Sequence, residues 1–375
     1  MKRNNGRSVI AALLVGTLIF ALLSLITAAT GDISVSARAA TLYEPENGKF
    51  IFEKNKGIRL PMASTTKIMT ALVAIENGDL SKKVTVDPRA VGIEGSSLYL
   101  QNGEELSLED LIYAVMLRSA NDAAAAVAYE ISGSIEAFSA LMNKKAAELS
   151  LSDTNFTNPH GLDDEEHYTT AHDLAIIAAA AVRNETFKKI ASTYKKTIEN
   201  SEGTKRLLVN HNKLLMLYDG AVGMKTGFTK RSGRCLVGAA ERDGVTLVSV
   251  TINAPDDWND HIRMLDLGFS LYEYRELAAE GEYSYSIPVI GSQTEKVTVK
   301  NLDSIGRVME KNASEVEAVV KLLRYTAAPV VKGDILGRVI FMQDGEEIAH
   351  LNLFATSDAK EKKDKSLFDI FRKKD

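Results

Sequence analysis

Cysteine is almost absent from this chain of 375 residues, in which Cys235 is the only one. A single thiol excludes an internal disulfide framework and any zinc or iron–sulfur site assembled from several cysteines. Cys235 lies in an apolar run and is expected to be a small buried strand residue. Stability must therefore come from core packing, for which 45% of hydrophobic residues is ample.

A surplus of positive charge is also missing. Lysine and arginine total 45 against 50 for aspartate and glutamate, which gives a formal net charge of −5. Nucleic-acid binding surfaces are strongly basic, so nucleic acid is not an expected partner. The sequence has neither an internal repeat nor a Gly/Ser-rich linker, and its length predicts two or three domains.

The six histidines lack the spacing of a zinc peptidase. Such an enzyme places two histidines four residues apart on one helical face, together with a carboxylate. His167 and His172 are five residues apart across a predicted helix start, and His160 is better explained as a loop-ordering residue. We therefore expect no metal and no other cofactor.

One long apolar run is present, at the N-terminus. Three basic residues within the first seven precede an uncharged stretch, residues 9–29, which ends in small residues. This order is typical of a secretory signal peptide, here residues 1–29, with cleavage near Ala29 or Ala37. The alternative is a retained membrane anchor, since about 20 apolar residues can span a bilayer. Both interpretations predict export, to the outer face of the cytoplasmic membrane or the cell wall.

The C-terminus differs in character from the rest of the chain. Residues 358–375 comprise a charged linker and a short segment whose apolar residues cluster along one helical side, namely Leu367, Phe368, Ile370 and Phe371. This pattern predicts a short amphipathic helix that lies on an anionic membrane surface. The alternative is a frayed, solvated tail.

Between these ends, the hydrophobic periodicity predicts two domains. Residues 30–277 begin with strands, the first over 33–37, and continue with a block of helices. One of these helices is predicted to start at the capping-box-like run 107–110 and to end near Leu117, and another to start at 170–173 and to end near Val182. Strands then return before a closing helix over 261–271. This order predicts an α+β domain whose sheet uses both ends of the segment, with helices on its faces. Residues 278–357 contain short strand-like runs punctuated by glycine, which predicts a small all-β, sandwich-like domain.

A serine and a lysine one helical turn apart form the first candidate catalytic pair. Ser64 lies at the entry of a helix predicted from Thr65, so Ser64 and Lys67, one turn on, project from the same face. A serine hydroxyl needs a base, and a lysine amine can serve once burial or a neighbouring cation lowers its pKa. The same spacing recurs at Ser192 and Lys195 in a polar stretch, so the spacing alone has little specificity.

Two further groups carry suitable chemistry. Ser119 and Asn121 lie in a turn between predicted helices, where a hydroxyl can relay a proton and an amide can hold the lysine amine. An ordinary capping turn is the alternative.

In the strand-like run 223–229, Lys225 supplies a second cation, and Thr226 supplies a hydrogen-bond donor for a carboxylate. Gly227 there permits close approach of a substrate backbone. The alternative for this run is an exposed basic strand end.

Together and in this order, the three motifs resemble those of the low-molecular-weight penicillin-binding proteins, which are serine-type D-alanyl-D-alanine carboxypeptidases of peptidase family S11. Four longer segments carry the resemblance: 60–72 (LPMASTTKIMTAL), 117–124 (LRSANDAA), 158–163 (NPHGLD) and 225–229 (KTGFT). A match over these longer segments is far more specific than a match to the three short motifs alone. The resemblance covers nearly all of the chain after the signal, including the small β domain and the tail.

The resemblance implies a β-lactamase/transpeptidase-like catalytic domain with an antiparallel sheet flanked by helices. It implies that Ser64 is the acylated nucleophile and Lys67 its general base, with Ser119 and Asn121 as proton relay and polar support. The implied reaction removes the terminal D-alanine from peptidoglycan stem pentapeptides through an acyl-enzyme. β-Lactams are expected to acylate the same serine.

For substrate binding, the resemblance implies that Lys225 is the cation and that Thr226 holds the terminal carboxylate. The oxyanion is expected to face the backbone N–H of Ser64 and one N–H near Phe228, after Gly227. An arginine that grips the carboxylate in some members has no clear counterpart here. Arg234 and Arg263 are both candidates.

Two alternative functions remain open at this point. A non-catalytic β-lactam or muropeptide receptor would keep the same serine and lysine. A weak β-lactamase is disfavoured because the acidic run 163–166 lacks the sequence context of a deacylating residue, and Ala120 stands where class A β-lactamases have aspartate.

Overall fold

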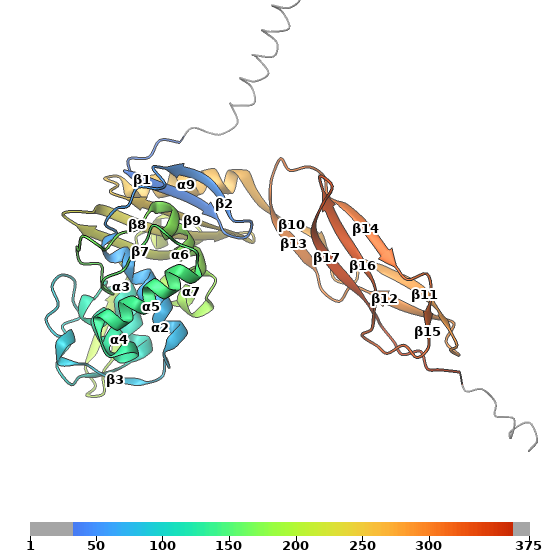
Figure 1. Ribbon diagram of the computed structural model, residues 1–375, viewed down its shortest axis with the longest axis horizontal. Helices are drawn as coiled ribbons and strands as arrows, with labels where there is room; N and C mark the ends of the chain where they lie inside the picture. Colours follow the sequence, from blue (N-terminus) through green and yellow to red (C-terminus); the bar gives the residue numbers. More distant parts are fainter. Residues whose placement is uncertain (1–32, 363–375) are drawn as a thin grey trace, which may run out of the picture. The chain divides into compact units, whose positions relative to one another are not determined.

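The computed structural model describes residues 33–362, which form two compact units (Figure 1). The first extends to Ser270 and the second begins at Leu271, with the turn 243–245 grouped with the second. The expected signal peptide and the apolar residues of the C-terminal tail lie outside the described residues. Each unit has its own buried core.

A five-stranded sheet frames the first unit, in the order β2-β1-β9-β8-β7. The pairs β1–β2, β1–β9 and β7–β8 are antiparallel. As predicted, strands from both ends of the segment share one sheet, and β7 forms its free edge. The strands are β1 (Ala39–Glu44), β2 (Lys49–Lys54), β7 (Ala221–Thr229), β8 (Gly233–Arg242) and β9 (Val245–Ile252).

Helices cover both faces of this sheet, as the alternation along β9 demonstrates. Val248 and Val250 belong to the large core shared with the helical block, whereas Ser249 and Thr251 face His261 of the closing helix. The helices are α2 (Lys67–Asn77), α3 (Leu108–Leu117), α4 (Asn121–Ser132), α5 (Ile135–Glu148), α6 (Ala171–Val182), α7 (Glu185–Ser192), α8 (Leu214–Leu217) and α9 (Asp257–Leu271).

Short elements complete the first unit. Two 3₁₀ turns, η1 (Ala63–Thr66) and η2 (Pro88–Ala90), accompany two small antiparallel hairpins. The hairpins are formed by β3 (Lys83–Thr85) with β4 (Glu105–Ser107), and by β5 (Lys195–Glu199) with β6 (Lys205–Val209).

Side-chain caps fix several helix starts at the predicted places. The hydroxyl of Ser107 accepts a hydrogen bond from the backbone N–H of Asp110 at the start of α3. The hydroxyl of Thr170 does the same for Asp173 at the start of α6. Both helices end where the periodicity indicated, at Leu117 and Val182.

Two local predictions in the first unit are wrong. Residues 33–37 form no strand, because the backbone N–H of Ser36 and that of Ala37 donate to the buried carboxylate of Asp260 instead of to a neighbouring strand. The closing helix begins at Asp257, four residues before the predicted start at His261. Acidic residues in its first turn are favourable at the positive end of a helix.

The second unit consists of β strands. A six-stranded sheet has the order β14-β16-β17-β12-β11-β15, and β10 pairs with β13 in a separate two-stranded sheet. The strands are β10 (Tyr272–Ala278), β11 (Ser284–Ile290), β12 (Lys296–Lys300), β13 (Ile305–Glu310), β14 (Glu317–Leu322), β15 (Thr326–Ala327), β16 (Ile335–Gln343) and β17 (Glu346–Ala355).

The prediction of an all-β unit is correct, but β10, β13 and the two-residue β15 were not predicted. β10 carries three charged residues among its seven, and β13 contains Gly306 and Arg307, so neither reads as an apolar run. β10 begins at Tyr272, ahead of the boundary expected at residue 277.

Candidate active site

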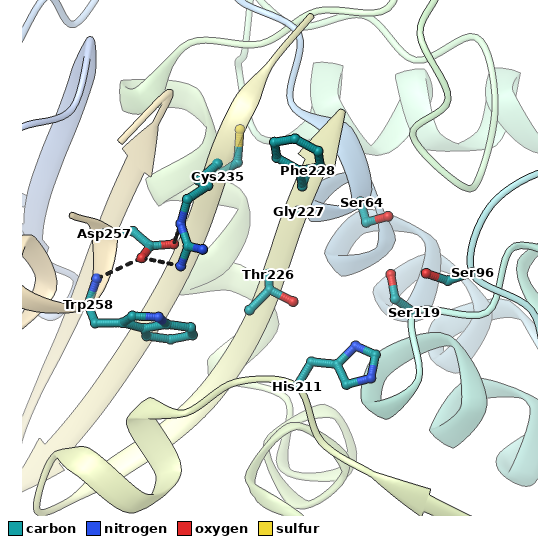
Figure 2. Close-up of a pocket in the computed structure, with 11 residues that line it drawn as sticks. Ser64, Ser96, Ser119, His211, Thr226, Gly227, Phe228, Cys235, Asp257 and Trp258 are labelled. Atoms are coloured by element: carbon teal, nitrogen blue, oxygen red, sulfur yellow. Dashed lines mark hydrogen bonds and ion pairs between the residues drawn. The ribbon is translucent and has the colours of Figure 1, made fainter. Parts of the chain in front are cut away.

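An open cleft of about 560 Å³ lies beside the exposed edge of the first unit's sheet (Figure 2). One wall comes from the nucleophile turn and the start of α4, and the other from β7, β8 and the start of α9. The lining residues are Ser64, Ser96, Ser119, His211, Thr226, Gly227, Phe228, Arg234, Cys235, Asp257 and Trp258.

Lys67 lies directly behind this cleft and is fully buried. It is the first residue of α2, one turn after Ser64 in η1, and its Nζ is 3.0 Å from Ser64 Oγ. Two carbonyl-type oxygens, Asn121 Oδ1 and the main-chain oxygen of His160, each lie 2.6 Å from the same Nζ. The structure thus brings the predicted serine–lysine pair into hydrogen-bond contact.

The surroundings of the Lys67 amine favour its neutral form. Burial lowers its pKa well below the usual range, the charge of Lys225 lowers it further, and Asp122 opposes the shift. A neutral amine has two N–H groups and one lone pair. In that form, Asn121 Oδ1 and the His160 oxygen, which can only accept, would take both N–H groups and leave the lone pair for the hydroxyl of Ser64.

Asn121 is positioned from both sides of its amide. Its Nδ2 donates to the main-chain oxygen of Glu94, and its backbone N–H donates to the oxygen of Ser96 at 2.7 Å. The neighbouring Asp122 accepts hydrogen bonds from the backbone N–H groups of Leu98 and Leu100. The start of α4 therefore fixes the 94–100 loop and the lysine amine together.

Ser119 precedes α4 in a left-handed backbone conformation, with a φ of 58°. Its hydroxyl points into the cleft toward Ser64 (Figure 2). A positive φ is costly for a residue with a side chain and is a feature of functional sites. The structure therefore gathers all four predicted catalytic residues at one end of the cleft.

Strand β7 supplies the opposite wall. Lys225 is buried, its Nζ donates to the main-chain oxygen of Thr226 at 2.8 Å, and desolvation lowers its pKa to about 7. Thr226 presents its side chain to the cleft, and Phe228 is 66% exposed at the rim (Figure 2). Lys225 is not among the lining residues, and its charge lowers the pKa of Lys67.

Gly227 lies in close contact with the nucleophile turn. A β carbon at this position would lie 3.0 Å from the backbone nitrogen of Ser64 and 3.2 Å from the oxygen of Met62, a tight approach. Gly227 also lines the cleft, where the sequence predicts close approach of a substrate backbone.

The two candidate arginines differ in position. Arg234, on β8, lines the cleft, and its Nε and Nη2 donate to the two oxygens of Asp257 at 3.1 Å and 2.6 Å. Arg263, on α9, pairs with Asp260 and Asp256 and is not among the lining residues. Only Arg234 is therefore placed to meet a ligand in this cleft.

Sequence reasoning did not single out Ser96, His211, Asp257 or Trp258 as cleft residues. Ser96 and His211 lie in irregular segments whose position depends on tertiary contacts, such as the hydrogen bond from His211 N–H to the oxygen of Leu117. Trp258 was assigned to packing. The residue before it, Asp257, is buried and pairs with Arg234, but this is evident only from the folded chain, so no local sequence signal marked Trp258.

Other predicted features have plain structural roles. Cys235 is a buried residue of β8, as predicted, and burial raises its pKa to about 11. The second Ser-x-x-Lys pair lies apart from the cleft, with Ser192 at the end of α7 and Lys195 at the start of β5. Within residues 33–362, no group of three or more histidine, cysteine, aspartate or glutamate side chains is arranged to hold a metal ion.

Comparison with known proteins agrees with this arrangement. Residues 26–256 match the sequence profile of the D-alanyl-D-alanine carboxypeptidases, and residues 272–361 match that of the C-terminal domain of penicillin-binding protein 5. The chain is 34% identical over 341 residues to D-alanyl-D-alanine carboxypeptidase DacF of Bacillus subtilis (strain 168), covering 88% of each chain. It is 32% identical over 345 residues to DacA of Haemophilus influenzae, covering 87% of this chain and 86% of that one.

The solved structures extend the similarity to three dimensions. Penicillin-binding protein 5 from Haemophilus influenzae superposes with a TM-score of 0.64 at 30% identity, covering 88% of this chain and 99% of that chain. A mutant of the Streptomyces K15 DD-transpeptidase superposes with a TM-score of 0.61 at 30% identity. It covers 64% of this chain and 100% of that chain.

Proposed function

This chain belongs to the D-alanyl-D-alanine carboxypeptidase family, peptidase family S11, and is a serine-type carboxypeptidase; we propose that Ser64 is its nucleophile and Lys67 its general base. The named relatives favour this activity over a non-catalytic receptor or a β-lactamase. The observation that carries the assignment of residues is the placement of Lys67 Nζ, 3.0 Å from Ser64 Oγ and 2.6 Å from each of two acceptor oxygens.

The first half of the reaction forms an ester. As Ser64 Oγ bonds to the carbonyl carbon of the penultimate D-alanine, its proton passes to the Lys67 lone pair. The peptide C–N bond then breaks. The proton leaves Lys67 and reaches the departing D-alanine amine through the hydroxyl of Ser119, which faces the same end of the cleft.

The second half restores the enzyme. Water attacks the ester carbon, its proton is taken by Lys67, and the C–O bond to Ser64 breaks as the proton returns to Oγ. Asn121 keeps Lys67 Nζ in place through both halves. The backbone N–H groups of Ser64 and of the β7 end near Phe228 are the proposed donors to the oxyanion.

The carboxylate of the substrate meets three cationic or donor groups. Thr226 lines the cleft, and its hydroxyl can donate a hydrogen bond to the carboxylate. Lys225 is buried and attracts the carboxylate through its positive charge. Arg234 donates only two of its five N–H groups to Asp257, one on Nε and one on Nη2. Its remaining N–H groups are available to a bound carboxylate, so we assign the clamp to Arg234 and not to Arg263.

Family membership implies a peptidoglycan stem peptide as substrate and β-lactams as acylating ligands. Class A β-lactamases release the acyl group rapidly because a carboxylate activates water against the ester. Among the described residues that line the cleft, the sole carboxylate is Asp257, which is engaged by Arg234. Slow release of a bound β-lactam is therefore the proposed outcome.

We further propose that the protein is exported and acts at the outer face of the cytoplasmic membrane or in the cell wall. The support is the signal-like order of residues 1–29 and the apolar side of the tail at Leu367, Phe368, Ile370 and Phe371. Among residues 33–362, no helix is both long enough and apolar enough to cross a bilayer.

The decisive experiment measures D-alanine release from diacetyl-L-Lys-D-Ala-D-Ala by the chain from Thr30 onward. We expect steady release by the parent protein, none by Ser64→Ala, and unchanged release by Ser192→Ala, which removes the serine of the other Ser-x-x-Lys pair. Absence of release by the parent, with penicillin still adding its mass to Ser64, would support the receptor function instead. Release by Ser64→Ala would overturn the assignment of the nucleophile.

A further inference from the structure

We propose that His167 is a positioning residue for the nucleophile turn, which it holds through Thr66 and the main-chain oxygen of Ala63 so that the backbone N–H of Ser64 points at the oxyanion. The inference rests on the proposed role of Ser64. His167 lies in the 157–168 segment, is almost completely buried, and does not line the cleft.

A directed chain of hydrogen bonds joins His167 to the turn. The backbone N–H of Thr157 donates to His167 Nδ1 at 3.0 Å, so Nδ1 must carry a lone pair. A neutral imidazole then bears its only hydrogen on Nε2, which lies 2.8 Å from Thr66 Oγ1. Because Oγ1 receives that hydrogen, the hydroxyl's own hydrogen goes to the Ala63 oxygen, 2.8 Å away.

These hydrogen bonds require a neutral imidazole, and the imidazole of His167 is neutral near pH 7. Burial lowers the pKa of His167 to about 4, against the opposing charge of Asp164. With a single hydrogen on the ring, each donor in this series of hydrogen bonds has one acceptor, so the direction of every hydrogen bond in the series is fixed.

The last acceptor in this chain controls the nucleophile. The oxygen of Ala63 and the N–H of Ser64 belong to one planar trans peptide group, so fixing the direction of the oxygen fixes the direction of the N–H. Ala63 has a φ of 48°, a left-handed conformation that a residue with a side chain keeps only when its surroundings hold it. The hydrogen bond from Thr66 supplies part of that restraint.

Gly161 packs against the same carbonyl and against Thr66. A β carbon at Gly161 would lie 2.0 Å from the Ala63 oxygen and 2.9 Å from Thr66 Oγ1. The segment that carries His167 is therefore packed directly against the peptide group that precedes Ser64. An oxyanion donor needs such orientation in advance, since its value depends on aim in the transition state.

Thr65 provides a matched control within the same turn. Its hydroxyl is also buried and also donates to a main-chain oxygen, that of Met62, at 2.6 Å. His167 bonds to Thr66 and not to Thr65 in the described structure. Removal of either hydroxyl costs a capping hydrogen bond, but only the Thr66 hydroxyl connects the turn to His167.

The test compares steady-state kinetics of D-alanine release for Thr66→Val, Thr66→Ser, Thr65→Val, His167→Leu, His167→Gln and the double variant Thr66→Val/His167→Leu. We expect Thr66→Val to lower kcat about 10- to 100-fold with little change in KM, because the oxyanion interaction exists only in the transition state. Thr66→Ser and His167→Gln should recover most of kcat, since each keeps the required donor and acceptor.

The double variant separates positioning from simple stability. If both residues act through one chain, the combined loss should not exceed the larger single loss, whereas Thr65→Val combined with His167→Leu should be additive. Equal kcat losses for Thr65→Val and Thr66→Val, or additive losses for Thr66 and His167, would overturn the proposal. So would a ¹⁵N spectrum with the hydrogen of neutral His167 on Nδ1. Ser64→Ala in the same assay tests the nucleophile independently.

Discussion

The backbone nitrogen of Ser64 and the α carbon of Gly227 lie so close that a β carbon on Gly227 would stand 3.0 Å from that nitrogen. The edge strand β7 and the nucleophile turn are therefore in backbone contact, without an intervening side chain. This contact places the lysine–threonine–glycine motif beside Ser64, so the glycine serves the architecture of the site before any substrate arrives.

Gly227→Ala should accordingly damage catalysis more than stability. The added methyl must displace η1 or β7 by a few tenths of an ångström, and small misplacements of reacting groups cost up to about 100-fold in rate. We expect kcat/KM for D-alanine release to fall by about 10- to 100-fold. Gly57→Ala is the control, because nothing lies within 4 Å of a β carbon there. An unaltered kcat/KM in Gly227→Ala would show that the contact is dispensable.

The two buried lysines predict a bell-shaped pH profile of kcat/KM. The acid limb reflects Lys67, which must lose its proton to act as a base, so activity rises with pH through its lowered pKa. The alkaline limb reflects Lys225, whose pKa is about 7 and whose charge is lost above that pH, weakening the attraction for an anionic substrate. Initial rates between pH 5 and 9 provide the measurement.

Lys225→Met distinguishes the two limbs. The charge of Lys225 lowers the pKa of Lys67, so its removal should raise that pKa and move the acid limb to higher pH, while the alkaline limb disappears. Lys195→Met is a control for the loss of one lysine, since Lys195 is exposed on β5. An acid limb that stays in place would mean that Lys225 does not tune Lys67.

Much of the catalytic unit was predictable because local signals agreed with the fold. Capping serines and threonines fixed the starts of α3 and α6, and the apolar period fixed their ends. The failure over residues 33–37 has a tertiary cause. Their alternation resembles a strand, but Asp260, more than 200 residues away, takes the backbone N–H groups. No local pattern reveals such a partner.

The candidate site likewise has residues that sequence motifs predict and features that depend on tertiary contacts. Ser64, Lys67, Ser119, Asn121 and Lys225 were found from motifs. The main-chain oxygen of His160 could not be found, because any residue type supplies a carbonyl. The contact of Gly227 with the nucleophile turn also depends on which backbone lies opposite it, and only the folded chain contains that information.

The arginine assignment can be tested with a matched pair. Arg234→Gln removes the guanidinium that lines the cleft, and we expect KM for the stem-peptide analogue to rise about 10-fold or more, since charged hydrogen bonds contribute about 1.5–3 kcal/mol. Arg263→Gln removes an arginine of similar exposure, with side chains 43% and 45% exposed, outside the lining. The reverse order of effects would assign the clamp to Arg263.

Buried histidine makes the catalytic unit sensitive to acid. His261 is completely buried between Ser249 Oγ, at 2.7 Å from Nδ1, and Thr251 Oγ1, at 3.0 Å from Nε2, and burial lowers its pKa to about 3. The unfolded chain therefore binds a proton below pH 6.5 that the folded chain does not. Stability is present above pH 6.5 and is lost as pH falls toward 3.

His261→Gln keeps a donor and an acceptor between the two hydroxyls but cannot be protonated. Its free energy of unfolding should depend less steeply on pH between 4 and 6, by about one proton or ~1.4 kcal/mol per pH unit. Denaturant titrations at several pH values, followed by fluorescence of the chain's single tryptophan, Trp258, report on this unit. His350→Gln, at a half-exposed histidine of the second unit, is expected to leave the slope unchanged. An equal slope for His261→Gln and the parent would mean that His261 takes up no proton on unfolding in this range.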